Sequence, residues 1–193
     1  MLQPVTAARK LTIDDLFATG DDRSELVHGE IVQKAAGNAP HGLAEDGVLA
    51  WARRRYARRP GGRWPGGWWI ISEIYVAYGT HEVFGHDVAG WRRDRLPALP
   101  AETIAVRPDW VCEVLSPGHE KRDLVDKLGV MHAAGVPDYW VVDHEKKLLF
   151  LYRHSPTGYV MRAVGADAVI DAPPFGATEL RVACILGDED DEE

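Results

Sequence analysis

One glutamate stands inside an apolar run near the middle of the chain. The run Trp-Val-Cys-Glu-Val-Leu occupies residues 110–115, and Glu113 carries its only charge. This composition is typical of a buried central strand, where a carboxylate is costly unless it is paired or binds a metal. Glu113 is therefore a candidate metal ligand. The alternative is a carboxylate at the strand end that is solvated or paired with Arg107 or Lys127.

A second acid is needed to hold a hard cation together with Glu113. Asp109 shares its strand face, but four residues along a strand span about 13 Å. Two carboxylates on one magnesium ion bring their oxygens within about 3 Å of each other. A neighbouring strand, about 4.8 Å away, is a better source. Asp87 meets this condition if residues 83–91 form that strand, and otherwise it is a turn residue in a glycine-flanked segment.

Three further side chains could complete such a site. Lys127 lies on a predicted helix that would pack back over the end of the Glu113 strand, where its ammonium could orient a water and stabilise charge on a phosphate. The alternative for Lys127 is a surface pair with Asp123, one helical turn earlier. Glu25 and His41 could each supply a third acid or a water-orienting base. A histidine in the position of His41 is otherwise a helix cap or a surface residue.

Motifs for several other chemistries do not occur in the sequence. There is no His-Glu-x-x-His, no Gly-x-Ser-x-Gly, no phosphate loop ending in Gly-Lys-Ser/Thr and no Gly-x-Gly-x-x-Gly. The two cysteines, Cys112 and Cys184, make no disulfide framework, which fits a reducing cytoplasm. We expect Cys112 to be a core residue that faces away from Glu113.

The pattern around these residues predicts a mixed α/β or α+β fold, with a central mixed sheet flanked by helices. In chain order, the expected elements are a helix capped by Thr12, a hairpin of 25–27 and 30–32, a helix over about 43–59, strands over 69–78, 83–91 and 110–115, a helix over 121–134, and strands over 139–142, 148–153 and 159–164. The helix over 43–59 has one apolar face, and we expect its arginines to cover the rest.

Length and composition are those of an ordinary globular protein. The chain has 193 residues, 46% hydrophobic and 27% charged, for which one domain is the default. We expect a loose arm over residues 1–10, a single domain over 11–186 and a solvated acidic tail over 187–193. No run of about 18 apolar residues and no signal pattern occurs, so we expect a cytoplasmic protein without a membrane span.

The net charge of −8 is unevenly distributed. Residues 188–193 carry six of the negative charges, whereas residues 53–63 contain six arginines. The average acidity therefore does not exclude a local basic face for nucleic acid. The candidate contacts are Arg53, Arg54, Arg58 and His41.

Several segments together resemble the Uma-type family of restriction endonucleases. They are Arg-Pro-Asp-Trp-Val-Cys-Glu-Val-Leu-Ser-Pro at 107–117, Asp123 and Lys127, Gly-Val-Pro-Asp-Tyr-Trp-Val-Val-Asp at 135–143, Ser-Glu-Leu-Val-His-Gly-Glu at 24–30 and His-Asp-Val-Ala-Gly-Trp at 86–91. The match extends over most of residues 11–183. The resemblance implies a restriction-endonuclease-like fold of the PD-(D/E)xK nuclease superfamily, in which two acids on adjacent strands hold magnesium and a lysine helps to activate water.

Carried over by this resemblance, the two metal-binding acids are Asp87 and Glu113, with a possible assisting role for Glu25. The chain departs from the pattern at two positions. His86 replaces the proline before the aspartate, and Leu115 replaces the lysine two residues after the glutamate. The resemblance therefore implies that Lys127, from the following helix, takes the role of the lysine.

The leading hypothesis is a Mg²⁺- or Mn²⁺-dependent phosphodiesterase that cuts DNA, with arginines near residues 53–63 on the backbone. A homodimer is plausible, since cutting two strands is easier with two sites. The competing hypothesis is a module that keeps the nuclease fold without its chemistry and binds nucleic acid or a protein. A third is hydrolysis of a smaller phosphoester.

Overall fold

A single large sheet forms the centre of the molecule. The computed structural model describes residues 9–34, 37–116 and 122–188. Its eight-stranded sheet has the order β2-β1-β4-β5-β6-β7-β8, and β3 pairs with β4 beside that path. These strands are β1 (Ser24–Val27), β2 (Glu30–Gln33), β3 (Trp68–Gly79), β4 (Glu82–Arg92), β5 (Trp110–Val114), β6 (Asp138–Asp143), β7 (Leu148–Ser155) and β8 (Gly158–Gly165). Strands β5 and β6 are parallel and the other pairings are antiparallel, so the predicted mixed sheet is confirmed.

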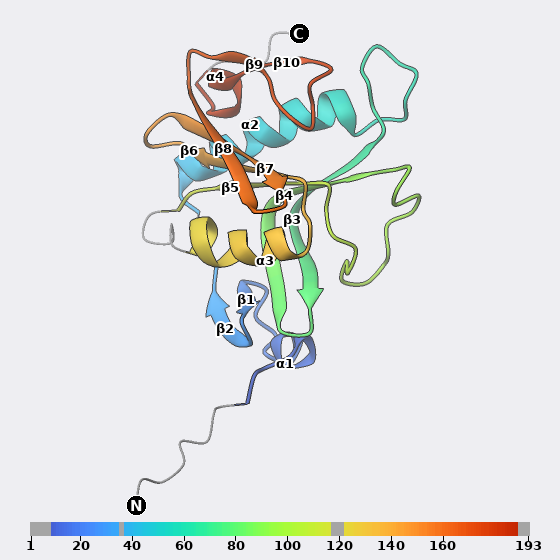
Figure 1. Ribbon diagram of the computed structural model, residues 1–193, viewed down its shortest axis with the longest axis vertical. Helices are drawn as coiled ribbons and strands as arrows, with labels where there is room; N and C mark the ends of the chain where they lie inside the picture. Colours follow the sequence, from blue (N-terminus) through green and yellow to red (C-terminus); the bar gives the residue numbers. More distant parts are fainter. Residues whose placement is uncertain (1–8, 35–36, 117–121, 189–193) are drawn as a thin grey trace, which may run out of the picture.

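Helices cover both faces of this sheet (Figure 1). Helix α2 (Ala39–Tyr56) and the short α4 (Val182–Ile185) cover one face, together with a two-stranded sheet of β9 (Val169–Asp171) and β10 (Glu179–Arg181). Helix α3 (Lys127–Ala133) lies on the other face and follows the π-helical turn η1 (Arg122–Asp126). Helix α1 (Ile13–Ala18) packs against β1.

The local signals in the sequence explain how the first elements start and turn. Thr12 and Asp15 form a capping box at the start of α1. In the β1–β2 hairpin, His28 and Gly29 have φ values of 54° and 83°. This left-handed pair gives a two-residue loop the twist that antiparallel strands need, and glycine adopts it without strain. The hairpin holds Glu25 and, just after β2, Lys34 near the rest of the site.

The two faces of the sheet bury separate cores. The core under α2 is aromatic: Trp51, Trp110 and Trp140 meet around Phe175, with ring centroids 4.8–5.6 Å from that phenyl ring. The core under α3 includes Met131. Cys112 faces the first core, as its alternation with Glu113 predicted. Both faces of β5 are therefore covered by core residues, so any charged side chain on that strand is buried.

Two expectations about the elements are wrong. Helix α2 ends at Tyr56 rather than near Arg59, and its arginines do not all face solvent. Arg55 is buried, because its guanidinium lies over the rings of Trp51 and Trp64 at 5.3 and 5.0 Å. The short elements β9, β10 and α4 were not anticipated, since none is long enough to show a periodic pattern.

Parts of three predicted segments lie outside the described residues. These parts are residues 1–8 of the arm, residues 189–193 of the tail, and residues 117–121 between β5 and η1. The single domain over 11–186 stays a prediction. None of the helices in the described ranges is long and apolar enough to cross a membrane.

Candidate active site

The candidate site lies at a fork in the sheet. Along one edge, β4 pairs with β3; along the other, it pairs first with β1 at Val83 and then with β5 at Val88–Gly90. Between those two pairings, side chains take the place of a strand. The Gly85 amide donates to Glu25 Oε1 at 2.9 Å, and the Gly85 carbonyl accepts from Lys127 Nζ at 3.5 Å. The fork thus brings charged groups from β1 and α3 to one point of β4.

Glu113 is the centre of a buried hydrogen-bonded chain. Its Oε1 accepts from Lys127 Nζ at 3.2 Å and lies 2.5 Å from His86 Nδ1. Lys127 Nζ also lies 2.9 Å from Glu25 Oε1. At the other end of the chain, the Tyr78 hydroxyl lies 2.7 Å from His86 Nε2. All of these groups except Tyr78 have 3% or less of their side chains exposed, so they neutralise one another rather than relying on water.

Asp87 lies beside Glu113 on the neighbouring strand. The β4–β5 register pairs Val88 with Cys112, and one step further it sets Asp87 opposite Glu113. The two oxygens of Asp87 have different partners. Oδ1 lies 2.9 Å from Lys34 Nζ, while Oδ2 accepts the Val114 amide at 2.7 Å. The aspartate is therefore held firmly in one orientation.

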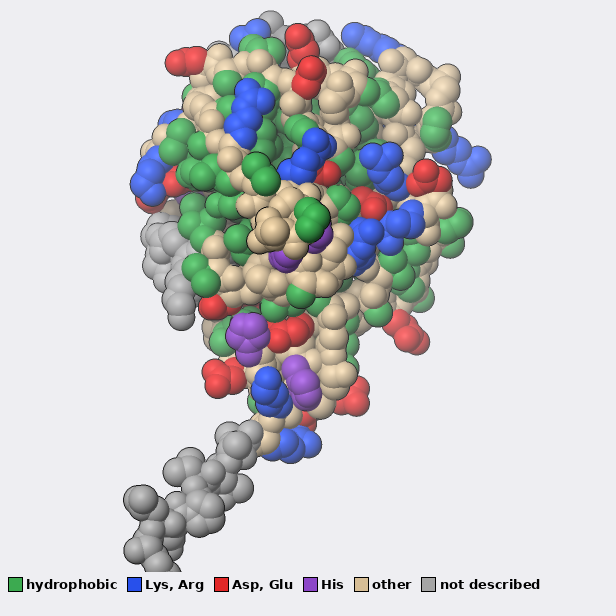
Figure 2. Space-filling view, in the orientation of Figure 1, with side chains coloured by type: hydrophobic (Ala, Val, Ile, Leu, Met, Phe, Trp, Pro, Cys, Tyr) green, Lys and Arg blue, Asp and Glu red, His purple; other side chains and the backbone are tan. Residues whose placement is uncertain are grey.

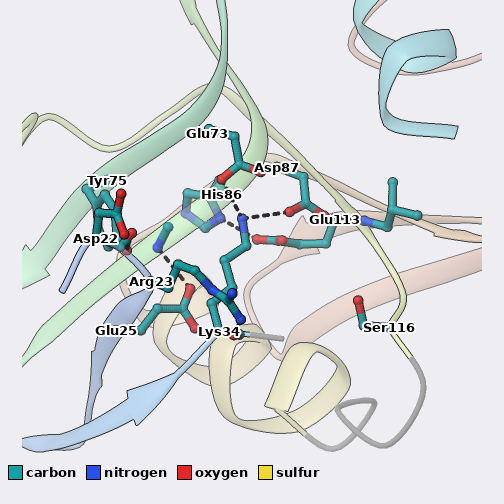
Figure 3. Close-up of polar contacts among 12 residues, drawn as sticks. Asp22, Arg23, Glu25, Lys34, Glu73, Tyr75, His86, Asp87, Glu113 and Ser116 are labelled. Carbon is teal, nitrogen blue, oxygen red and sulfur yellow. Dashed lines mark hydrogen bonds and ion pairs between the residues drawn. The ribbon is translucent and has the colours of Figure 1, made fainter. Parts of the chain in front are cut away.

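Lys34 and Glu73 complete this side of the site (Figure 3). Lys34 Nζ lies 2.9 Å from Glu73 Oε2 as well as from Asp87. Glu73 has a φ of 48° in the middle of β3, which is uncommon for a residue with a side chain. In Figure 3 its carboxylate points toward Lys34, whose ammonium thus lies between an exposed and a buried acid.

The first turn of α2 adds a histidine and another acid next to Asp87. His41 Nε2 lies 3.7 Å from Asp87 Oδ2, and His41 Nδ1 lies 3.3 Å from the Ser116 hydroxyl. Glu45 follows one helical turn after His41 on the same side of the helix. One ligand atom from each of His41, Glu45 and Asp87 lies within 4.8 Å of the others.

A cleft of about 380 Å³ opens beside this cluster. Both positive and negative side chains line it. The lining residues are Arg23, Lys34, Gly37, Asn38, His41, Gly42, Glu45 and Glu73. Asp87 and Glu113 lie behind it, with 2% exposure each. A ligand entering the cleft would meet Lys34, His41 and Glu45 before it reached the two buried acids.

Burial shifts the pKa values of the groups at the fork. Burial raises the pKa of Glu113 to about 7, against the attraction of Lys127 and with help from Asp87. Burial, with the Lys127 ammonium nearby, lowers the pKa of His86 to about 3. Burial alone would raise the pKa of Asp87, but Lys34 outweighs it and the pKa is lowered. His86 is thus a neutral ring. Because Glu113 Oε1 already accepts from Lys127, the tautomer that fits has Nδ1–H donating to Glu113, which leaves Nε2 to accept from Tyr78.

The raised pKa of Glu113 predicts a pH dependence of stability. Because the folded state holds the proton up to a pH of about 7 and the unfolded state only to about 4.5, the folded state binds more protons in between. The contribution of Glu113 to stability is thus present below about 4.5 and lost as the pH rises to about 7. We expect the free energy of unfolding of the wild type, minus that of Glu113→Gln, to fall by up to about 1.4 kcal/mol per pH unit in that window.

Urea unfolding of both proteins between pH 4 and 8 measures this difference. The subtraction removes the contributions of groups that both proteins share. A difference that is flat from pH 4.5 to 7, or that rises with pH, would contradict a raised pKa at Glu113.

The structure brings together all of the acids and the lysine that the sequence suggested. Asp87, Glu113, Lys127 and Glu25 meet at the fork. For Lys127, the alternative of a surface pair is wrong, since the residue is fully buried. Asp87 is a strand residue rather than a turn residue. Glu113 forms an ion pair with Lys127, which was one of the alternatives to its being a metal ligand. The roles of these residues stay predictions.

Asp109 has a structural role. It accepts from the Arg92 amide and forms an ion pair with Arg95, whose Nε lies 2.8 Å from Oδ1. It is not part of the fork, in agreement with the argument from strand spacing.

His41 lies apart from the arginines with which it was grouped. It stands at the start of α2, thirteen residues before Arg54, or about 20 Å along the helix. Two of these arginines, Arg54 and Arg58, line a separate hollow of about 320 Å³, together with Arg59, Gly62, Arg63 and Trp64. Of the predicted contacts, Arg53 is exposed but donates to the Ile70 carbonyl, and Arg58 is exposed.

Lys34, Glu45, Glu73 and Tyr78 were not predicted as part of the site, and His86 was noted only as a departure from a motif. The first three are ordinary charged residues, and the sequence around them has no distinctive local pattern. The spacing His-x-x-x-Glu at 41–45 is the one signal that could have pointed to Glu45, since it sets both side chains on one face of a helix.

Comparison with known proteins agrees with this fold. A family model described as "Putative restriction endonuclease", that of the Uma2 family, matches residues 11–183. The chain belongs to this family. A comparison with curated proteins gave no match.

A solved structure similar to this chain is described as "a putative nuclease belonging to DUF820" from Anabaena variabilis. The two chains are 18% identical with a TM-score of 0.74, over 91% of this chain and 97% of that one. The similarity extends over nearly the whole of both chains, and at this identity it establishes the fold.

Proposed function

We propose that this protein is a metal-dependent endonuclease that hydrolyses phosphodiester bonds in DNA. The observation that carries the proposal is the juxtaposition of Asp87 and Glu113 on adjacent strands, with the Lys127 ammonium 3.2 Å from Glu113. Membership of the Uma2 family, described as "Putative restriction endonuclease", supports the same reaction class.

The two acids fit a hard divalent cation. Both offer carboxylate oxygens, the ligands that Mg²⁺ and Mn²⁺ prefer. Both contacts that Glu113 makes here end on Oε1, and within the described ranges Oε2 has no hydrogen-bond partner. When bound, such an ion supplies Lewis-acid polarisation of a phosphate oxygen and a more acidic water.

The chain's own groups would hold and tune this site. His86 donates to Glu113 and fixes its orientation, and Lys127 balances the charge of both Glu113 and Glu25. Lys34, at the inner side of the cleft, is the ammonium best placed to contact a phosphate that enters there. We propose that Lys127 acts from behind Glu113 to orient the attacking water.

The arginine hollow beyond α2 would hold the DNA backbone. Basic side chains lie at the upper right of Figure 2, over the loop that follows α2. Along α2, His41, which lies beside Asp87, and Arg54, which lines the hollow, are about 20 Å apart, the length of about six nucleotides at 3.4 Å each. Dimerisation stays a prediction.

Removing an arginine from the hollow should change the salt dependence of DNA binding. We expect Arg58→Ala to weaken binding and to reduce the slope of log affinity against log salt by about 0.9, the value for one lost phosphate contact. Fluorescence anisotropy on a duplex between 50 and 200 mM salt, in EDTA, would measure it. Arg162→Ala, an exposed arginine on β8, is the control. Equal slopes for the wild type and Arg58→Ala would remove the hollow from the interface.

The second candidate function is a binding module without catalysis. It is favoured by one observation: the cations of the chain itself already neutralise both acids, Lys34 on Asp87 and Lys127 on Glu113. The deciding experiment incubates the full chain with plasmid DNA, and in parallel with RNA, in Mg²⁺, Mn²⁺ or EDTA. Metal-dependent nicking supports the nuclease. DNA binding that persists in EDTA, without cleavage in either metal, supports the module.

A further inference from the structure

Next to the paired acids, the start of α2 presents a second group of possible ligands. From the geometry we infer that His41, Glu45 and Asp87 form a cation site of their own, which prefers an ion that accepts imidazole, such as Mn²⁺, Co²⁺ or Zn²⁺, over Mg²⁺. This site would share Asp87 with the site proposed above but would not use Glu113. It rests on the placement of these three residues and not on the nuclease reaction.

The three donor atoms are close enough to bind one ion. They lie within 4.8 Å of one another, and His41 Nε2 is 3.7 Å from Asp87 Oδ2. Ligand atoms on one ion, at bond lengths of about 2.0–2.2 Å, lie about 3–4.4 Å apart. Small side-chain rotations would therefore bring all three donors to bonding distance.

The surrounding contacts orient these donors. The Ser116 hydroxyl contacts His41 Nδ1, which leaves Nε2 facing Asp87. Such a contact on the far ring nitrogen is the usual support of a metal-binding histidine. The Val114 amide holds Asp87 Oδ2, and Lys34 contacts the other oxygen, Oδ1, so the ammonium and an ion would not compete for one atom.

A second imidazole lies beside the cluster. His144, directly after β6, is 6% exposed, and its ring meets that of His41 edge-on at 6.4 Å. His144 Nδ1 is buried and has no hydrogen-bond partner among the described residues. A buried polar atom without a partner is costly in an apolar setting, and a hydrated ion at His41 would provide polar groups nearby. The cleft of about 380 Å³ gives such an ion access to His41 and Glu45.

The choice of ion follows from the ligand types. Mg²⁺ binds oxygen atoms almost exclusively and keeps several waters. An imidazole nitrogen suits later transition metals, and Mn²⁺ accepts both nitrogen and oxygen. One histidine with two carboxylates therefore favours a transition metal.

The test is a calorimetric titration of the full chain with Mn²⁺ alone and with Mg²⁺ alone, without nucleic acid. We expect Mn²⁺ to bind at least about tenfold more tightly than Mg²⁺. We expect Glu45→Gln and His41→Ala each to weaken Mn²⁺ binding at least about tenfold. We expect Glu113→Gln to retain this binding, and Glu179→Gln, an exposed acid on β10, is the matched control.

Circular dichroism of each variant shows whether a loss reflects unfolding, and Glu45→Gln keeps the side-chain shape at a half-exposed position. Mn²⁺ binding that Glu113→Gln abolishes and Glu45→Gln leaves intact would overturn the inference while keeping the acid pair of the proposed function. So would the absence of Mn²⁺ binding in the wild type. DNA cleavage is measured separately, so the nuclease proposal can fail while this site stands.

Discussion

Glu113→Gln should lower the rate of DNA cleavage by at least about a thousandfold while leaving the fold intact. Glutamine keeps the shape of the side chain but loses the charge that would hold a cation opposite Asp87. A bound metal is worth several kcal/mol of transition-state stabilisation, and each 1.4 kcal/mol changes the rate tenfold. The glutamine can still accept from Lys127, so the buried chain of contacts keeps its connections.

The measurement is the initial rate of plasmid nicking in Mn²⁺ and in Mg²⁺, with circular dichroism to confirm folding. Glu102→Gln, an exposed glutamate between β4 and β5, is the control and should cleave like the wild type. Cleavage by Glu113→Gln at the wild-type rate would exclude Glu113 from the chemistry. It would leave the cluster at His41 as the place to look for the metal.

Lys127→Met should have the largest effect on stability. The ammonium is fully buried between Glu25 and Glu113 and also contacts the Gly85 carbonyl. Methionine fills a similar volume but leaves two buried carboxylates without this cation. Removing one partner of a buried ion pair costs about 3–5 kcal/mol. We expect a loss of that size in the free energy of unfolding at pH 7.5, measured by urea denaturation.

Lys147→Met provides the matched control. Lys147 pairs with Asp188 at the surface, with 46% and 41% of the two side chains exposed, and such pairs contribute about 0–1 kcal/mol. If Lys127→Met lost no more stability than Lys147→Met, the fork would not depend on its ammonium. Because both variants are judged by unfolding, this result does not depend on whether the protein cuts DNA.

Much of the framework could be predicted from the sequence because its signals are local. Runs of β-branched and aromatic residues marked β3–β8. Thr12 marked the start of the first helix, and the spacing of the early hairpin marked its turn at His28 and Gly29. Strand spacing alone was enough to reject Asp109 and favour Asp87 as the neighbour of Glu113. Because a helix was predicted to follow β5 and to pack back over the end of that strand, Lys127 on that helix could be expected near Glu113.

The remaining parts of the site depend on contacts between distant segments. Lys34 leaves a short edge hairpin, and nothing in its neighbourhood along the chain indicates that it reaches Asp87. His86 differs from the expected proline, and only the β4–β5 pairing reveals that its ring donates to Glu113. Phe175, at the centre of one core, lies in a segment with no periodic pattern. In each case tertiary packing, not local preference, decides the contact.

The fork in the sheet has a consequence for how relatives of this chain can be interpreted. Glu25 and Lys127 stand in for a missing strand by satisfying both backbone groups of Gly85. A descendant that had given up its chemistry would still need them in order to fold. Their retention in another sequence is therefore a sign of shared architecture and says little about activity. Among the described residues, Glu45 contacts no backbone group, and it lies partly buried on a helix, so its retention would be the more telling sign that a site is still in use.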